Sequence, residues 1–275
     1  MTAVDPRVTR REVPGDGVRL SVVHYESDGP DLVILGGITS TATALDFIAH
    51  ELSDRYNVVV PDLRGRGRSD RSGPGRYTLD DYRGDLDAVI AAFSLRDPVL
   101  VGHSLGARIA GRWAADHHLH GPLLLVDPPM SSKRRPYPTS WETFSTQLEQ
   151  AHAGATADTI RRWFPDWPER ELGIRAQELP TCDEIAVRET HEGFETDEFE
   201  NDWIRLTPPV TLLYGADSRM VTADDARLLT EMAPLAQVIA VPDAGHMVPW
   251  DNLPGFLAAV DAALMTTSRP GGNDD

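Results

Sequence analysis

The sequence predicts an α/β fold in which helices flank a mostly parallel β-sheet and one helical insert interrupts the pattern. Short apolar runs typical of buried strands alternate with helical patterns at both ends of the chain. This alternation stops between residues 130 and 208, where the patterns are helical throughout. A sharp turn, Gly102-His103-Ser104-Leu105-Gly106, joins one apolar run to the helix that follows it. Strands that alternate with helices form parallel sheets covered on both faces, so these three observations predict the fold class.

Composition restricts the classes of partner. The 275 residues are 41% hydrophobic and carry a formal net charge of −17, which is typical of a globular protein and disfavours nucleic acid or anionic membrane as a partner. No run of about 18 apolar residues predicts a transmembrane helix, and the polar start lacks an apolar signal core. The single cysteine, Cys182, excludes an internal disulfide and a cysteine-rich metal site. We expect a cytoplasmic protein that acts on a small molecule; its oligomeric state stays open.

The first part of the chain carries four predicted strands. Residues 18–25 alternate apolar and polar side chains, which predicts a strand at one sheet edge. Continuous apolar runs predict buried strands further on. The predicted strands are 18–25, 32–35, 57–60 and 98–101, and the predicted helices are 42–52, 79–93 and 107–115.

The second part of the chain adds a strand at 122–126, the insert, and a return of the strand–helix alternation. The returning elements are strands 210–214 and 237–241 and helices 223–232 and 252–265. We therefore expect a core of residues 1–129 and 209–267, a helical cap of residues 130–208, and a disordered Gly-, Pro- and Asp-rich tail of residues 268–275.

The insert is predicted to act as a lid. It follows the strand after the Ser104 turn and its helix, so it can lie over the carboxyl edge of the sheet, where ligands bind in α/β proteins. Four of the six tryptophans of the chain fall in it, and aromatic rings suit the apolar wall of a pocket. A peripheral helical decoration is the simpler alternative.

Ser104 is the predicted nucleophile. A strand before and a helix after it are the context in which Gly-x-Ser-x-Gly forms a nucleophile elbow. Such a turn holds the serine in a strained backbone conformation, so its neighbours must be small. The simpler interpretation of Ser104 as a helix N-cap is disfavoured by the partners described next.

His246 is the predicted general base. A serine hydroxyl needs a base within hydrogen-bond distance and a third group that orients the base. Of the nine histidines, His246 lies in a turn after the last apolar strand and before the last helix. His103 is adjacent to Ser104, but neighbouring residues on the turn point in different directions, so we expect His103 to support the turn.

Two backbone N–H groups are predicted to bind the oxyanion of a tetrahedral intermediate. One belongs to Leu105, the residue after the nucleophile, and the other to Ile38, in the loop Gly36-Gly37-Ile38 that follows an earlier strand. Glycines in this loop would let the backbone approach a substrate closely.

The acid that orients His246 has two candidates. Asp127 ends the strand 122–126, and the two prolines after it would fix the exit path of the chain. Asp217 follows the strand 210–214. Spacing alone does not choose between them.

These motifs resemble the α/β-hydrolase superfamily over nearly the whole chain, and within it the N-formylmaleamate deformylase group of nicotinate degradation. The segment Val60-Pro61-Asp62-Leu63-Arg64-Gly65-Arg66-Gly67-Arg68-Ser69 resembles the superfamily's loop after the third core strand. The segments that resemble the deformylase group are Gly37-Ile38-Thr39-Ser40, Ser72-Gly73-Pro74-Gly75, Gly102-His103-Ser104-Leu105-Gly106-Ala107-Arg108-Ile109, Val126-Asp127-Pro128-Pro129, Arg134-Arg135-Pro136-Tyr137-Pro138 and Ala244-Gly245-His246-Met247-Val248-Pro249-Trp250.

The resemblance implies Ser104 as nucleophile, His246 as base and Asp127 as acid. In the superfamily the usual acid lies three residues after the glycine that ends the later strand. Counted from Gly215, that position is Ser218, which cannot carry the charge. Asp217 comes one residue early, and on an extended segment this turns its side chain the other way. We therefore favour Asp127 and keep Asp217 as the alternative.

The expected function is hydrolysis of a small amide or ester by a Ser-His-Asp acyl-enzyme mechanism without a cofactor or a metal. A formamide-like bond, including one on an unsaturated dicarboxylate, is the favoured substrate, and Arg108, Arg134 and Arg135 are the candidate cations for its carboxylate. Three alternatives stay open: a carboxylesterase or lactonase, a non-hydrolytic ligand receptor on the same fold, and a lyase or cofactor-free oxygenase that uses His246 alone.

Overall fold

One mixed sheet organises the part of the chain described by the computed structural model, residues 7–117, 119–207 and 209–267. Within these residues eight strands pair in the order β1-β2-β4-β3-β5-β6-β7-β8. β2 is antiparallel to both β1 and β4, and the remaining neighbours are parallel. The α/β fold class predicted from the sequence is confirmed. The strands are β1 Val8–Pro14, β2 Arg19–Tyr25, β3 Asp31–Leu35, β4 Asn57–Pro61, β5 Val99–His103, β6 Leu123–Val126, β7 Val210–Gly215 and β8 Gln237–Val241.

The predicted edge position of strand 18–25 is wrong, because β1 covers that edge. β1 pairs with β2 along its whole length, from Val8 opposite Tyr25 to Pro14 opposite Arg19. Its middle residues are Arg10, Arg11 and Glu12, so the segment lacks the apolar pattern of a strand. A charged strand of this kind is typical of a sheet edge, where it discourages pairing with other chains.

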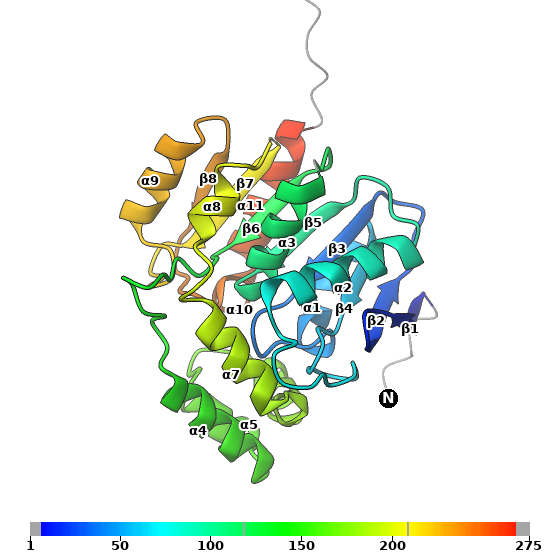
Figure 1. Ribbon diagram of the computed structural model, residues 1–275, viewed down its shortest axis with the longest axis vertical. Helices are drawn as coiled ribbons and strands as arrows, with labels where there is room; N and C mark the ends of the chain where they lie inside the picture. Colours follow the sequence, from blue (N-terminus) through cyan, green and yellow to red (C-terminus); the bar gives the residue numbers. More distant parts are fainter. Residues whose placement is uncertain (1–6, 118, 208, 268–275) are drawn as a thin grey trace, which may run out of the picture.

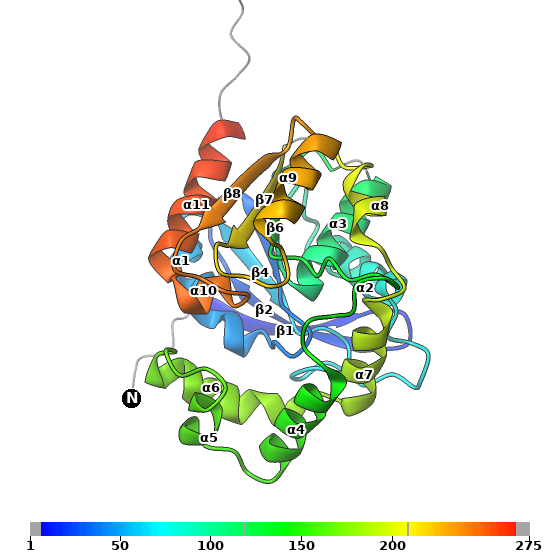
Figure 2. The same ribbon diagram turned by 90° about the vertical axis from the view of Figure 1, so that its left-hand side faces the viewer.

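Helices cover both faces of the sheet. Figure 2 shows α1 and α11 on one face and α2 and α3 on the other. This double cover explains the continuous apolar runs of β3 to β6, whose side chains are almost all buried. α2 and α9 each begin with a capping box, formed by Thr78 with Asp81 and by Thr222 with Asp225. The core helices are α1 Asp46–Ser53 after the 3₁₀ turn Thr43–Leu45, α2 Leu79–Ala92, α3 Leu105–His117, α9 Ala223–Met232, α10 Val248–Asp251 and α11 Leu253–Thr267.

The insert divides into two parts. Helices α4 to α7 lie together at the bottom of both views, whereas α8 lies beside α3 (Figures 1 and 2). The α8 residue Trp203 is fully buried, and its indole N–H donates to the Leu229 carbonyl of α9 at 2.9 Å. The end of the range 130–208 thus packs with the core, and we use the word cap for α4 to α7. The insert helices are α4 Trp141–His152, α5 Ala157–Arg161, α6 Glu169–Glu178, the 3₁₀ turn Leu179–Thr181, α7 Glu184–Gly193 and α8 Phe199–Trp203.

Two further points concern the limits of the chain. The tail predicted to be disordered, residues 268–275, lies outside the described residues. Among the residues that the structure describes, no helix is long and apolar enough to cross a membrane.

Candidate active site

The candidate site lies at the carboxyl edge of the parallel strands. β3, β5, β6, β7 and β8 are neighbours in that order, so the loops after them meet. The loop after β3 holds Ile38, the turn after β5 holds Ser104, and the loop after β8 holds His246. Asp127 directly follows β6.

Ser104 occupies the strained turn between β5 and α3. Its φ angle is 55°, in the left-handed region that is uncommon for a residue with a side chain. Steric contacts explain why glycines flank Ser104. A Cβ on Gly102 would lie 2.2 Å from the Gly106 carbonyl oxygen, and a Cβ on Gly106 would lie 2.2 Å from the Leu35 carbonyl oxygen. The Gly-x-Ser-x-Gly pattern thus allows β5, α3 and β3 to approach closely around the serine.

Ser104, His246 and Asp127 form a hydrogen-bonded chain. His246 Nε2 lies 3.1 Å from Ser104 Oγ, and His246 Nδ1 lies 2.7 Å from Asp127 Oδ2. Asp127 is fully buried, and its φ angle of 47° is the second strained value in the site. Burial raises the pKa of the Asp127 carboxyl group, and hydrogen bonds from His246 and Ser218 oppose this rise. In this hydrogen-bonded arrangement His246 has the geometry that a general base needs to take the serine proton.

Asp217, the alternative acid, is not part of this hydrogen-bonded triad. Its side chain is exposed, and its backbone N–H donates to the Ala244 carbonyl oxygen at 2.9 Å. The next residue, Ser218, is buried and donates from Oγ to Asp127 Oδ2 at 2.6 Å. Asp217 lines the cavity over Ser104, but among the described residues it is Asp127, supported by Ser218, that bonds to His246 Nδ1.

His103 supports the loop that carries His246. His103 Nε2 lies 2.8 Å from the His246 carbonyl oxygen, and the two imidazole rings are 5.0 Å apart. Burial, together with the nearby His246, lowers the pKa of His103 to about 3. His103 is therefore neutral near pH 7, and its ring serves as a spacer behind the His246 loop.

Buried arginines hold the loop after β3 beside Ser104. A Cβ on Gly37 would lie 3.4 Å from Ser104 Cβ, so this loop passes next to the nucleophile. Arg66 Nε donates to the Ile38 carbonyl oxygen at 2.9 Å. Arg175 Nη1, from the cap helix α6, donates to the Thr39 carbonyl oxygen at 2.6 Å. Both the core and the cap thus fix the loop that carries the predicted oxyanion donor Ile38.

A cavity of about 400 Å³ opens over Ser104, between the core and the cap. The core side includes Ile38, Ser104 and His246, and the insert side includes Tyr137 and Phe164. Tyr137 is buried, which raises the pKa of its hydroxyl group, while a hydrogen bond with the Ser104 side chain lowers it. Of the four insert tryptophans only Trp163 lines this cavity; Trp167 stacks on Trp250 with ring centres 5.4 Å apart.

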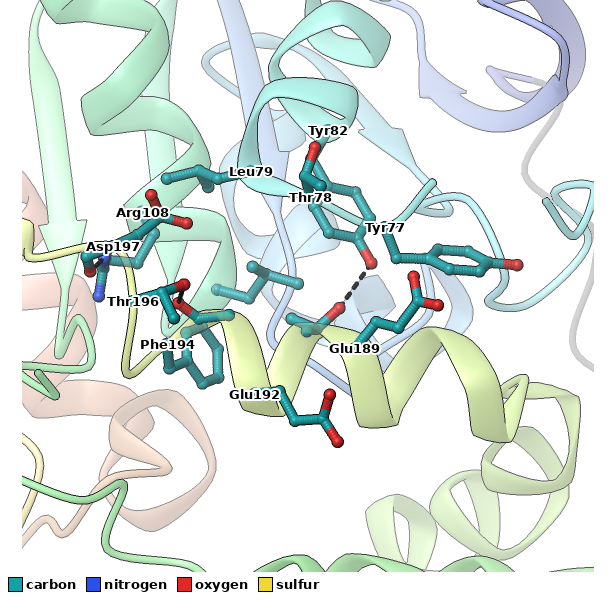
Figure 3. A pocket seen from close by; sticks show the side chains of 13 residues that line it. Tyr77, Thr78, Leu79, Tyr82, Arg108, Glu189, Glu192, Phe194, Thr196 and Asp197 are labelled. Carbon is teal, nitrogen blue, oxygen red and sulfur yellow. Dashed lines mark hydrogen bonds between the residues drawn. The ribbon is translucent and has the colours of Figure 1, made fainter. Parts of the chain in front are cut away.

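The three predicted substrate-binding arginines are not among the residues that line the Ser104 cavity, which corrects their expected position. Arg108 lies at a second cavity, of about 240 Å³, between α3 and α7; Figure 3 shows it beside Asp197. Its guanidinium is buried and donates to the carbonyl oxygens of Pro129 and Asp197. Arg135 pairs with Asp225 at 2.6 Å, and Arg134 is exposed at the same turn.

The arginines that do line the Ser104 cavity are Arg175 and Arg219. No role was predicted from the sequence for either of them, nor for Tyr137. α6 reads Glu-Arg-Glu-Leu-Gly-Ile-Arg-Ala-Gln-Glu, a polar helix in which nothing marks Arg175 as buried. Arg219 directly follows Ser218, in the same segment as the alternative acid Asp217.

Comparisons with known proteins agree with this geometry. Residues 32–260 match the model of the alpha/beta hydrolase family. The chain is 35% identical to N-formylmaleamate deformylase from Pseudomonas putida, covering 90% of this chain and 93% of that protein. It is 27% identical to 2-(acetamidomethylene)succinate hydrolase from Mesorhizobium japonicum, covering 82% of this chain and 84% of that protein.

Solved structures give the same result. The structure of N-formylmaleamic acid deformylase from Pseudomonas putida S16 superposes with a TM-score of 0.85 at 37% identity, covering 92% of this chain and all of that one. E-2-(acetamidomethylene)succinate hydrolase superposes with a TM-score of 0.78 at 25% identity, covering 94% of this chain and 99% of that one. The resemblance noted in the sequence is confirmed: the chain belongs to the alpha/beta hydrolase family.

Proposed function

We propose that this protein is a serine hydrolase that cleaves a small formamide-like amide through an acyl-enzyme. The observation that carries the proposal is the hydrogen-bonded chain from Ser104 Oγ through His246 to the buried carboxylate of Asp127. The two relatives named above support the amide class, because one is named as a deformylase of N-formylmaleamate and the other as a hydrolase of 2-(acetamidomethylene)succinate.

In the first half of the reaction, Ser104 Oγ attacks the carbonyl carbon while His246 Nε2 takes the hydroxyl proton. Asp127 keeps His246 in the correct tautomer and stabilises the imidazolium. The N–H groups of Ile38 and Leu105 donate hydrogen bonds to the negatively charged oxygen of the tetrahedral intermediate. The C–N bond then breaks, and His246 returns its proton to the leaving nitrogen.

In the second half, water attacks the ester carbonyl of the acyl-enzyme. His246 takes one proton of this water, the Ser104 ester bond breaks, and the serine oxygen regains a proton from His246. For a formamide the products are formate and the free amide or amine. Each bond formed to Ser104 in the first half is broken in the second, so the enzyme is regenerated.

The test is a substrate panel of formamides including N-formylmaleamate, other small amides, esters and lactones, with wild type and Ser104→Ala. We expect formate release from formamides by wild type and a fall in kcat of at least about 10⁴-fold in Ser104→Ala. Ser145→Ala is the matched control, because Ser145 lies on α4 and does not line the Ser104 cavity.

Three results would contradict the proposal. Substantial turnover by Ser104→Ala would favour the lyase or oxygenase alternative that uses His246 alone. Absence of a stoichiometric burst of 4-nitrophenol from 4-nitrophenyl acetate, together with no turnover of the panel, would favour the receptor alternative. A preference for esters or lactones over every amide would assign the same residues to a carboxylesterase or lactonase.

A further inference from the structure

Arg175 is a buried cation without a carboxylate partner among the residues that the structure describes. Only 7% of the residue surface is exposed. Nη1 and Nη2 donate to the Thr39 carbonyl oxygen and to Thr39 Oγ1, at 2.6 and 2.8 Å, and both acceptors are uncharged. The nearest acids along the chain are engaged elsewhere: Glu171 pairs with Arg170 at 2.6 Å, and Glu178 accepts from Thr41 Oγ1 at 2.8 Å.

Arg64 and Arg66, two other buried arginines, are balanced differently. Arg64 forms two hydrogen bonds of 2.7 Å with the carboxylate of Asp85. Arg66 has no carboxylate partner in the described structure, but it donates to five oxygens and lies outside the Ser104 cavity. Arg175 uses only two of the five N–H donors of its guanidinium and lines the cavity. Its remaining donors therefore lie where a ligand can reach them.

Arg175 is connected to the nucleophile Ser104 through the loop that carries Ile38. Its partner Thr39 follows Ile38, the proposed oxyanion donor, and both line the cavity with Ser104. The Phe164 ring lies 6.0 Å from the guanidinium carbon and lowers the local polarity. An ionised group in such surroundings is costly unless it is paired, and an anion bound there is held more strongly than in water.

We propose that Arg175 forms a carboxylate subsite, so that the substrate is an amide bearing a carboxylate a few bonds from the scissile carbonyl. This inference rests on the proposed function and adds the chemical class of the substrate. The planar guanidinium can bind a carboxylate through two parallel hydrogen bonds while its other edge stays on Thr39. A bound substrate thereby bridges the cap helix α6 and the loop that carries Ile38.

The test is a binding measurement that does not depend on turnover. Isothermal titration calorimetry compares maleamate, an anion, with maleamide, its neutral diamide, on wild type, Arg175→Met and Arg175→Lys. We expect wild type to prefer maleamate and Arg175→Met to weaken maleamate binding about 30-fold, with maleamide binding changed less than about threefold. Arg175→Lys should recover only part of the loss, because an ammonium group cannot bind in the same two-point manner.

Two further variants test whether the effect on maleamate binding is specific to Arg175. Arg227→Met removes one positive charge from α9, where Arg227 pairs with Asp224 outside the cavity, and should leave both affinities unchanged. Arg219→Met removes the other arginine of the cavity lining and should reduce maleamate affinity less than Arg175→Met does. Thermal unfolding of each variant checks that it is folded.

Equal affinity of wild type for the two compounds would overturn the carboxylate subsite. So would an unchanged ratio of the two affinities in folded Arg175→Met, or a loss of that ratio in Arg219→Met alone. Failure of the proposed function is recognised separately, because it appears as turnover retained by Ser104→Ala or as no turnover in the panel, whatever the two affinities are.

Discussion

Ser218 Oγ lies 2.6 Å from Asp127 Oδ2, the same carboxylate oxygen that lies 2.7 Å from His246 Nδ1. Asp127 follows β6 and Ser218 follows β7. Because these strands are adjacent and parallel, the two residues meet at one edge of the sheet. Ser218 stands at the position where the resemblance to the superfamily would place an acid. Its hydroxyl group instead donates to an acid that comes from the neighbouring strand.

Replacing each candidate acid by asparagine tests this arrangement. We expect Asp127→Asn to lower kcat by about 10⁴-fold, because the amide favours the wrong tautomer of His246 and cannot stabilise the imidazolium. Asp217→Asn should stay within about tenfold of wild type, a difference of several kcal/mol in activation free energy. Steady-state kinetics on folded variants gives both values, and the reverse ranking would assign the acid to Asp217.

Ser218→Ala tests the support that Asp127 receives. Removing one hydrogen bond to the carboxylate should lower kcat by about tenfold, since hydrogen bonds to charged groups contribute about 1.5 kcal/mol or more. The measured quantities are kcat and KM, with Ser145→Ala as the control serine. An unchanged kcat would mean that the Ser218 hydroxyl group is not needed to hold Asp127 in place.

Tyr137→Phe tests the hydroxyl group that the insert places at Ser104. Because Tyr137 lines the cavity with Ser104, whose side chain lowers the pKa of the tyrosine hydroxyl group, we expect the loss of this hydroxyl group to lower kcat about tenfold with a smaller change in KM. Tyr214→Phe on β7 is the control, since Tyr214 does not line the Ser104 cavity. A rise in KM alone would show that Tyr137 acts in substrate binding and not on the serine.

His103 predicts a pH dependence of stability. Its pKa falls from 6.5 to about 3 on folding, mainly through burial. Between these two values the unfolded chain binds more protons than the folded one, so the free energy of unfolding falls as the pH falls. His103→Gln removes this titration while keeping an N–H donor for the His246 carbonyl oxygen.

From pH 6.5 to 4.5, wild type should lose about 2 kcal/mol more stability than His103→Gln. Urea unfolding at several pH values measures the difference, and the comparison between the two proteins cancels the contributions of the other titrating groups. Parallel stability curves for the two proteins would contradict the prediction.

The sequence by itself determined the local elements and the nucleophile turn. Apolar runs marked the parallel strands because a strand covered on both faces must be apolar throughout. Gly102 and Gly106 marked the turn because their neighbours leave no room for a Cβ. The order of strands then placed the loops of Ile38, Ser104 and His246 at one edge of the sheet.

Only the tertiary structure decided which charged side chains face the Ser104 cavity. β1 was not predicted, because its charged central residues are stabilised by pairing with β2, which is a contact between separate segments. Arg108 was expected at the substrate but hydrogen-bonds to two backbone carbonyl groups elsewhere, whereas Arg175 reaches the cavity from a polar helix. Helical periodicity shows which residues share a face, but the partner of that face depends on how the cap docks on the core. That docking is a sum of long-range contacts, and no local pattern in the sequence records it.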